Sequence, residues 1–360
     1  MEKPAKKRVL IVDDAVVMRK MLSDALTRDP ALEVAGTASN GRFALAKFPA
    51  LKPDIILLDI EMPEMDGLET VRQLRKLDAR IPIIMFSTLT EHGASATLEA
   101  LALGATDYVT KPSNRDVAET LETVSRELIP RIHALCHLPA ACAVVVPKSP
   151  APSARLWRPP SLAPVQVVAI GVSTGGPDAL ARLLPSLPVD LPVPVLIAQH
   201  MPPIFTALLA ARLSAKSAIP VRECVSGEPL QPGCAVLAPG DFHMVVSKED
   251  VTRLRVHQDA RENYCRPSVD VLFRSVAQVY GGRSLAVILT GMGQDGLKGC
   301  ESLRALGARV CVQDEASSVV WGMPGFVARS GLADKILPLD QIAAEIVRAT
   351  TLQAAARSHS

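Results

Sequence analysis

Four short apolar runs in the first third of the chain each lead directly into residues that can bind or transfer a charged group. These residues are Asp13 with Asp14, Asp59, Ser87 and Lys111. Three carboxylates brought together repel one another unless a cation joins them, and oxygen ligands at this density suit Mg²⁺. Asp59 could then accept a phosphoryl group while Mg²⁺ and the Lys111 ammonium neutralise the phosphoryl oxygens and Ser87 hydrogen-bonds one of them. A single aspartate after a strand is more often a helix cap, so only the combination supports this prediction.

A second set, in the other half of the chain, combines a serine, a histidine and an aspartate. Ser173 follows one apolar run and is flanked by glycines, His200 follows the next run, and Asp295 lies in a glycine-rich segment after a third. In such a set, His200 would take the Ser173 proton as general base, and Asp295 would fix the imidazole tautomer. A backbone N–H near Met292 could bind the oxyanion of a tetrahedral intermediate.

Other interpretations of this second set explain fewer of its residues. Gly171, Gly175 and Gly176 loosely match a dinucleotide-binding loop with Asp190 downstream, but that interpretation leaves the histidine and Asp295 unexplained. The chain order Ser, His, Asp differs from the Ser, Asp, His order of α/β-hydrolases. A zinc hydrolase would need a His-x-x-x-His or comparable cluster, which the sequence lacks.

The elements that must position these residues alternate between strand and helix patterns. In the first 130 residues, strands are expected at 9–12, 55–58, 83–86 and 108–110, and helices at 14–26 and 68–77. In the second half, strands are expected at 165–170, 193–198, 235–237, 244–246, 285–290 and 310–312, and helices at 179–184, 205–213 and 297–306. Such alternation predicts parallel sheets covered by helices on both faces, with ligands beyond the carboxyl ends of the strands. Turn residues 238–241 predict a β-hairpin between the runs at 235–237 and 244–246.

Length and composition predict two domains joined by a linker. The 360 residues suit two domains of about 100–200 residues each, and 48% hydrophobic residues suffice for two cores. From about residue 131 to 163 the chain holds six prolines and no acidic residue, which predicts an extended, semi-rigid spacer. We therefore expect domains at 7–128 and 164–348, with a proline-rich linker at 129–163.

Charge and cysteine usage exclude several function classes. The net charge is +2, with only 3% aromatic residues, so nucleic acid is not expected as a partner. Seven cysteines without a Cys-x-x-Cys pair indicate reduced thiols. Neither a signal region nor an apolar stretch of about 18 residues is present, so we expect no membrane insertion and a cytoplasmic location.

The first set of residues resembles the receiver domain of bacterial response regulators over about residues 7–128. The likeness is carried by Asp13-Asp14, by the stretch from Leu57 to Gly67 around Asp59, and by Lys111-Pro112. It implies a flavodoxin-like fold and phosphorylation of Asp59 by a histidine kinase. It also implies Mg²⁺ held by Asp14, Asp59 and the Glu61 carbonyl with Asp13 assisting, and Ser87 and Tyr108 as the switch pair.

The second set resembles the catalytic domain of the chemotaxis protein-glutamate methylesterases over about residues 164–348. The likeness is carried by Gly-Val-Ser-Thr-Gly-Gly-Pro at 171–177, Gln-His-Met-Pro at 199–202, Arg-Pro-Ser-Val-Asp at 266–270 and Gly-Met-Gly-Gln-Asp-Gly at 291–296. It implies a mainly parallel α/β domain that hydrolyses glutamate methyl esters on chemoreceptors and deamidates receptor glutamines. Ser173, His200 and Asp295 would be catalytic, without a cofactor. Thr174, Arg266 and Met292 would line the site.

Two such domains in one chain predict an esterase controlled by phosphorylation for chemotaxis adaptation. We expect the unphosphorylated receiver domain to cover the Ser173 cleft and phosphorylation of Asp59 to open it. The protein is expected to act as a monomer. An alternative is a paralogous receiver-regulated esterase in a signalling array outside chemotaxis. A DNA-binding output domain is disfavoured because the second half is near neutral, with 18 basic and 17 acidic residues from 164 to 360.

Overall fold

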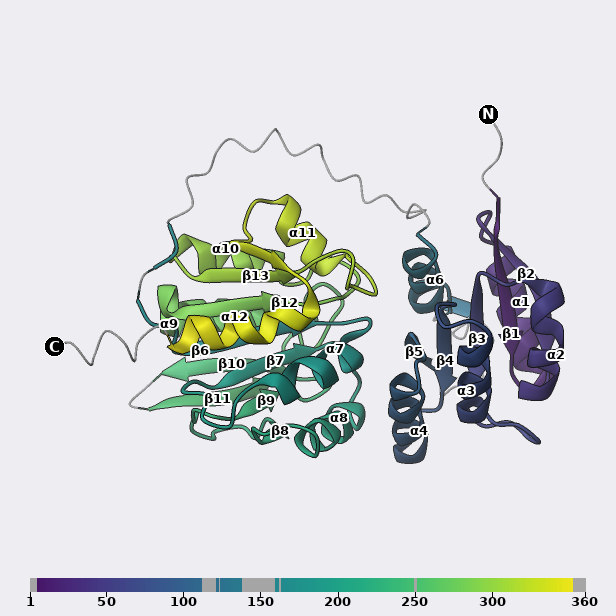
Figure 1. Ribbon diagram of the computed structural model, residues 1–360, viewed down its shortest axis with the longest axis horizontal. Coiled ribbons are helices and arrows are strands. Elements are labelled where there is room, and N and C mark those ends of the chain that lie inside the picture. The colour runs from purple at the N-terminus through teal and green to yellow at the C-terminus, as the bar shows by residue number, and fades with distance from the viewer. Residues whose placement is uncertain are drawn as a thin grey trace. The chain divides into compact units, whose positions relative to one another are not determined.

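The chain forms two compact units, residues 1–147 and residues 148–360. A computed structural model (Figure 1) describes residues 5–111, 121–122, 124–137, 159–161, 163–248 and 251–351. Among the helices within these ranges, none combines the length and apolar character required to cross a membrane.

The first unit is built on a five-stranded parallel sheet. Its strands are β1 (Lys7–Val12), β2 (Leu32–Ala38), β3 (Ile55–Asp59), β4 (Ile83–Ser87) and β5 (Asp107–Thr110). They lie in the order β2-β1-β3-β4-β5, and every neighbouring pair is parallel. The four predicted strands are confirmed. The edge strand β2 was not predicted, because its middle residues are only half-buried and include Gly36 and Thr37.

Helices cover both faces of this sheet, as expected for a doubly wound domain. They are α1 (Val16–Thr27), α2 (Gly41–Leu51), α3 (Gly67–Leu77), α4 (Glu91–Ala102), the π-helix Val124–Leu128 and α6 (Ile129–Leu135). The last of these corrects the prediction that the linker is extended from residue 131. Ile132 is fully buried and Leu135 nearly so, and Pro130 stands at the first turn, where its missing N–H breaks no helical bond. Residues 138–158 of the predicted linker lie outside the described ranges.

The second unit contains a seven-stranded parallel sheet and a separate hairpin. The sheet strands are β6 (Val167–Val172), β7 (Val195–Gln199), β8 (Val221–Glu223), β9 (Ala235–Leu237), β12 (Ser284–Ile288), β13 (Arg309–Gln313) and β14 (Lys335–Leu337). Their order is β14-β13-β12-β6-β7-β9-β8, so β6 lies centrally between β12 and β7. The hairpin pairs β10 (His243–Lys248) with β11 (Thr252–His257) in antiparallel register. A mainly parallel α/β unit with a β-hairpin is therefore confirmed.

The position of the hairpin differs from the prediction. Residues 238–241 do not join two antiparallel strands, because β9 pairs with β7 and β8 in the parallel sheet. The three residues of β9 are fully buried, and parallel pairing on both sides satisfies their backbone. The chain then leaves the sheet before β10 begins.

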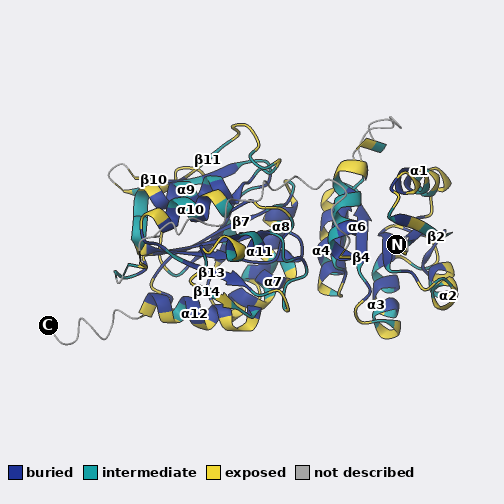
Figure 2. Cartoon of the chain, turned by 90° about the horizontal axis from the view of Figure 1, so that it is seen from above, coloured by how far each residue is buried: buried dark blue, intermediate teal, exposed yellow. Residues whose placement is uncertain are grey.

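Helices on both faces of the second sheet bury its strands. They are α7 (Gly176–Leu183), the 3₁₀ turn Leu184–Ser186, α8 (Phe205–Ser214), α9 (Val269–Tyr280), the 3₁₀ turn Gly281–Arg283, α10 (Leu297–Ala305), α11 (Met323–Arg329) and α12 (Leu339–Thr351). Apolar side chains of α9 and α10, such as Phe273 and Leu303, pack with Val167 and Leu196 of the strands in one core cluster. Figure 2 shows the strands as the buried layer, while the outward faces of helices such as α12 are exposed.

Candidate active site and phosphoryl-acceptor site

An acidic cluster lies at the carboxyl edge of the first sheet, where four adjacent strands end. Asp13 follows β1, Asp59 ends β3, Ser87 ends β4 and Lys111 follows β5. The Lys111 Nζ lies 2.7 Å from Asp59 Oδ2 and 3.2 Å from Asp13 Oδ2. One carboxylate oxygen from each of Asp13, Asp14 and Asp59 lies within 4.8 Å of the others. The structure thus brings together the residues that the sequence placed in one phosphoryl-transfer site.

The electrostatics of this cluster favour a cation. Burial raises the pKa of Asp59 to about 6, although the Lys111 ammonium lowers it, and the charge of Asp13 adds to the rise. Asp13 Oδ2 is buried and accepts no hydrogen bond among the described residues, so its only partner there is the lysine. Among the residues that the structure describes, Lys111 is the one cation paired with these carboxylates, so carboxylate charge is left unbalanced. The all-oxygen donor set fits Mg²⁺, and so does a buried Asp13 oxygen that accepts no hydrogen bond among the described residues.

The other predicted residues of this site lie around the same edge. A pocket at the cluster is lined by residues that include Asp14, Glu61, Ser87 and Lys111. Ser87 Oγ donates to the Gly93 carbonyl at 3.1 Å. The Tyr108 ring is buried on β5, where burial raises the pKa of its hydroxyl. The Asp14 and Glu61 side chains are exposed, so both can be reached from solvent.

In the second unit, Ser173 is positioned by the tight turn between β6 and α7. Its N–H donates to the Thr290 carbonyl at 3.0 Å, and its carbonyl accepts from Gly176 N–H at 2.8 Å. Gly175 has a φ of +76°, a conformation that favours glycine. On the other side, a Cβ added to Gly291 would lie 2.9 Å from Ser173 Cβ. Close backbone approach on both sides therefore fixes the serine.

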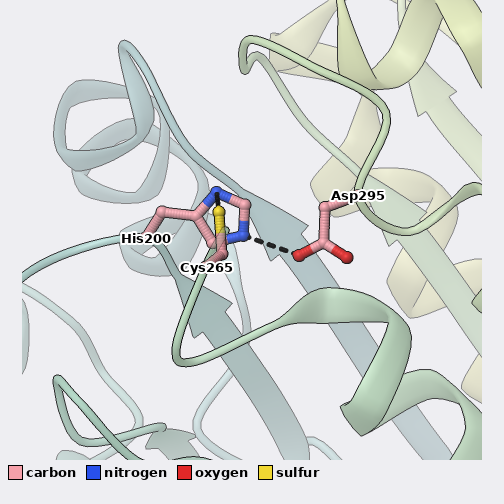
Figure 3. A group of neighbouring side chains, drawn as sticks. All are labelled: His200, Cys265 and Asp295. Atoms are coloured by element: carbon pink, nitrogen blue, oxygen red, sulfur yellow. Dashed lines mark hydrogen bonds and ion pairs between the residues drawn. The ribbon is translucent and has the colours of Figure 1, made fainter. Parts of the chain in front are cut away.

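His200 and Asp295 form a direct pair beside this turn (Figure 3). His200 Nε2 lies 2.8 Å from Asp295 Oδ2. The backbone N–H of His200 donates to the Val172 carbonyl at 3.2 Å. The other ring nitrogen, Nδ1, faces Cys265 Sγ at 3.5 Å. Burial lowers the pKa of His200, but Cys265 and the hydrogen bond to Asp295 raise it by more, so the net pKa lies above its usual value. Because an ionised carboxylate only accepts, Nε2 carries the shared proton.

The three predicted catalytic residues thus follow three neighbouring strands, but they are not all in contact. Ser173 follows β6, His200 follows β7, and Asp295 lies seven residues after the end of β12. Within the described ranges, Ser173 Oγ makes no hydrogen bond, and both ring nitrogens of His200 face other partners. The structure pairs the histidine with the aspartate and places the serine turn next to them.

Asp295 is held by a set of donors that sequence reasoning missed. Its oxygens accept from Asn263 Nδ2, Ser268 Oγ and the backbone N–H groups of Val269, Asp270 and Gly296, at 2.7–3.1 Å. Burial opposes ionisation, but the hydrogen bonds from His200 and the backbone hold the pKa of Asp295 well below its usual range. The neighbouring Asp270 is affected in the opposite direction, because burial and the Asp295 charge raise its pKa to about 6.

Of the missed residues, Ser268 and Asp270 had a signal in the sequence. Both belong to the Arg-Pro-Ser-Val-Asp stretch at 266–270, in which only Arg266 was assigned a role. Asp270 Oδ1 accepts from the N–H groups of Gly296 and Gly299, so it ties α9 to the loop that carries Asp295. Cys265 gave no signal, because its contact with His200 joins residues 65 positions apart.

The predicted lining residues lie close to the site but differ in their burial and in the hydrogen bonds they make. Thr174 is buried, and its carbonyl accepts from Thr290 Oγ1 at 2.9 Å. Met292 is half-buried in the loop after β12. The Arg266 guanidinium donates to Asp241 Oδ1 at 2.8 and 3.1 Å and to the carbonyls of Gln258 and Asp259. Within the described ranges, Arg266 makes no hydrogen bond with the catalytic candidates.

Comparison with known proteins matches both units. A family model described as CheB methylesterase matches residues 168–346, and one described as Response regulator receiver domain matches residues 9–122. A protein-glutamate methylesterase/protein-glutamine glutaminase of Trichodesmium erythraeum is 48% identical over 347 residues, which cover 95% of this chain and 99% of the relative. A protein of the same name from a Nocardioides species is 50% identical over 349 residues, which cover 95% of this chain and 94% of the relative.

A solved structure agrees with the fold of the second unit. The crystal structure of the CheB methylesterase catalytic domain of Thermotoga maritima aligns with a TM-score of 0.51 and 38% sequence identity. The alignment covers 52% of this chain and 99% of that domain.

Proposed function

Because the chain belongs to the family of protein-glutamate methylesterases/protein-glutamine glutaminases with a receiver domain, we propose that it demethylates glutamate methyl esters on chemoreceptors and deamidates receptor glutamines. Chemotaxis adaptation is the usual role of this family. The observation that carries the proposal is the His200–Asp295 pair at 2.8 Å, beside a serine held in a tight turn.

The catalytic steps follow from the roles proposed for these side chains. Ser173 Oγ attacks the ester carbonyl carbon, and its proton passes to a neutral His200 as the tetrahedral intermediate forms. The Met292 N–H stabilises the oxyanion. The intermediate then expels methanol, which takes the proton from His200, and leaves an acyl-enzyme on Ser173. Water deprotonated by His200 cleaves the acyl-enzyme, which frees the carboxylate and restores the serine. With a glutamine substrate, ammonia leaves in place of methanol.

Asp295 acts through His200 in this mechanism. It keeps one nitrogen protonated and stabilises the imidazolium that forms when the serine proton is taken. Its own hydrogen bonds to the backbone hold it ionised and oriented, so the imidazole is the group that gains and loses the proton.

The receiver domain controls this reaction through Asp59. A histidine kinase of the chemotaxis system is the proposed phosphodonor, and an Asp59 carboxylate oxygen attacks the phosphohistidine phosphorus to form an acyl phosphate while the kinase histidine leaves. Asp14, Asp59 and the Glu61 carbonyl would hold Mg²⁺, with Asp13 assisting; the ion would neutralise phosphoryl charge. Lys111 contributes a second positive charge, and Ser87 and Tyr108 respond to the phosphoryl group.

The proposed regulation is relief of occlusion. In this scheme the first unit, with α6 at its end, forms the switch and residues 164–348 form the esterase. The unphosphorylated switch covers the Ser173 cleft, and phosphorylation shifts the equilibrium toward an open arrangement. The enzyme would work in the cytoplasm as a monomer, without a cofactor for hydrolysis.

The experiment that tests the proposal is methanol release from methylated chemoreceptors by the full chain, with and without a small phosphodonor. Ser173→Ala should lose at least about 1,000-fold in kcat/KM while still accepting a phosphoryl group. Asp59→Asn should keep the basal rate and lose the activation by phosphodonor. A folded Ser173→Ala variant with full activity would refute the catalytic assignment.

A further inference from the structure

Cys265 contacts the proposed catalytic pair, and the proposed mechanism leaves it without a role. Its Sγ lies 3.5 Å from His200 Nδ1, the ring nitrogen that does not face Asp295 (Figure 3). Cys265 and His200 are half-buried, so solvent reaches both residues, whereas Asp295 is buried.

The three side chains together offer a set of metal ligands. One ligand atom from each of His200, Cys265 and Asp295 lies within 4.8 Å of the others. Zinc bonds of about 2.0–2.3 Å at tetrahedral angles place two ligand atoms about 3.3–3.8 Å apart. Asp295 Oδ2 lies 2.8 Å from His200 Nε2, which is short of that spacing, and Cys265 Sγ lies 3.5 Å from the other ring nitrogen. The His200 ring must therefore rotate so that one nitrogen faces both other ligands, which already lie within 4.8 Å of each other. We propose that His200, Cys265 and Asp295 bind a Zn²⁺ ion, and that this ion inhibits the enzyme.

The donor types select zinc over the hard cation expected in the receiver domain. Thiolate and imidazole are soft or borderline ligands that favour Zn²⁺, whereas Mg²⁺ prefers oxygen alone. The acidic cluster of Asp13, Asp14 and Asp59 contains only oxygen ligands. The chain therefore carries two metal sites of different preference.

The surroundings of the zinc ligands are already ordered as a metal site requires. Asp295 Oδ1 accepts from Asn263 Nδ2 and Ser268 Oγ, and the backbone N–H of His200 donates to the Val172 carbonyl. Groups in this outer layer orient the ligands and support metal affinity. With three protein ligands, a water molecule completes the tetrahedron, as in open zinc sites.

Binding would exchange protons for the metal. Zn²⁺ takes the place of the proton between His200 Nε2 and Asp295 Oδ2, and that proton moves to Nδ1 of the neutral ring. The Cys265 thiol loses its proton on forming the Zn–S bond, so one proton is released. A ring bound to zinc cannot orient against Asp295 or accept the Ser173 proton. With free Zn²⁺ at ten times its Kd, activity should fall to about one-tenth. The inhibition, unlike the binding, rests on the function proposed above.

The test is direct zinc binding to the full chain in excess Mg²⁺, which occupies the oxygen-only cluster. Equilibrium dialysis should give one zinc per chain, and Co²⁺ in its place should give the near-ultraviolet charge-transfer absorption of a cobalt–thiolate bond. Cys265→Ser should weaken zinc binding at least about tenfold and abolish that absorption. The matched control is Cys234→Ser, whose hydroxyl can keep the bond that Cys234 Sγ donates to the Gln231 carbonyl, and it should bind like the parent.

Two results would overturn the zinc site: no binding at 100-fold excess of zinc over protein, or equal binding and cobalt absorption in Cys265→Ser and the parent. Cys265→Ala provides a second variant that cannot ligate, and circular dichroism checks that each variant is folded. Methanol release in metal-free buffer tests the esterase proposal separately. An active enzyme that binds no zinc would refute only the metal site, and an inactive protein that binds zinc would refute only the esterase.

Discussion

Gly291 provides the most direct test of how the Ser173 turn is positioned. Its N–H donates to the Val320 carbonyl at 3.0 Å, and its carbonyl accepts from the N–H groups of Gly322 and Met323. A methyl group added here would press on Met323 Sδ and would lie 2.9 Å from Ser173 Cβ and 3.1 Å from Ser173 N. Because Met323 is fully buried, it has little room to yield.

The size of the effect follows from these contacts. Ordinary carbon–carbon contact begins near 3.4 Å, so Gly291→Ala must push the serine or the loop by about 0.5 Å. Overpacking of this kind reduces the free energy of unfolding by about 1–3 kcal/mol. A nucleophile misplaced by about 1 Å loses about 100-fold in rate, so a fall of about 10- to 100-fold in kcat/KM is expected.

The assay measures kcat/KM for methanol release together with thermal unfolding. Gly331→Ala is the matched control, because Gly331 is exposed, has a φ of +71° and would meet nothing within 4 Å. The control should lose about 1–2 kcal/mol of stability through backbone strain and keep its kcat/KM. If Gly291→Ala stays within twofold of the parent, or if the control loses as much activity, the contact is not what positions Ser173.

Three further predictions concern other contacts. Ser268→Ala removes the Oγ–H donor to Asp295 Oδ1, at 2.9 Å. It should lower kcat/KM about tenfold and shift Tm by only a few degrees. An unchanged kcat/KM in steady-state assays would contradict this. Omitting Mg²⁺ should abolish activation by a phosphodonor and leave basal methanol release unchanged, whereas activation that persists without Mg²⁺ would exclude the proposed ion. Glu345→Gln should lower the free energy of unfolding by about 1 kcal/mol at pH 7, because Glu345 pairs with Lys335 and Arg348. Burial raises the pKa of Glu345, but these partners lower it by more. A carboxyl whose folded pKa is lowered stabilises the fold fully above its unfolded pKa, so the difference should shrink as the pH falls below about 4.5 and vanish once the pH lies below the folded pKa. Urea unfolding at pH 7 and pH 3 would show an equal difference if the pair were irrelevant.

The sequence predicted the central strands better than the edges. Runs such as Ile55–Leu58 and Leu285–Ile288 are apolar throughout because helices cover both faces of those strands. The edge strands β8 and β14 have three residues each, which is too short for a pattern; β8 has one buried and two half-buried residues, and β14 has two half-buried and one exposed. The helix α9 was missed although its buried residues Val269, Leu272, Phe273 and Val276 recur at helical spacing, because its start overlaps the motif at 266–270.

The sequence predicted the site residues that directly follow strands, but not the residues that hydrogen-bond to Asp295. Residues directly after neighbouring parallel strands must meet at one sheet edge, so the sequence could place Ser173 and His200 together. Asp295 lies beyond such a position, and its donors Asn263 and Ser268 lie 32 and 27 residues away in the chain. Such bonds depend on how α9 docks against the loop after β12, and local sequence patterns do not contain that information.

The two sheet edges hold carboxylates of opposite character, and this explains how their cation chemistry differs. Asp13 Oδ2 accepts no hydrogen bond among the described residues and faces only Lys111, so its lone pairs remain open to an added cation. Asp295 accepts from His200 and from five further donors, which saturate the roughly four lone-pair sites of a carboxylate. A cation can reach Asp295 only by displacing the His200 proton. Zinc can compensate for that displacement by bonding to the ring nitrogen and to Cys265 Sγ, whereas magnesium bonds only weakly to nitrogen and sulfur. Metal binding and catalysis should therefore exclude one another at this edge.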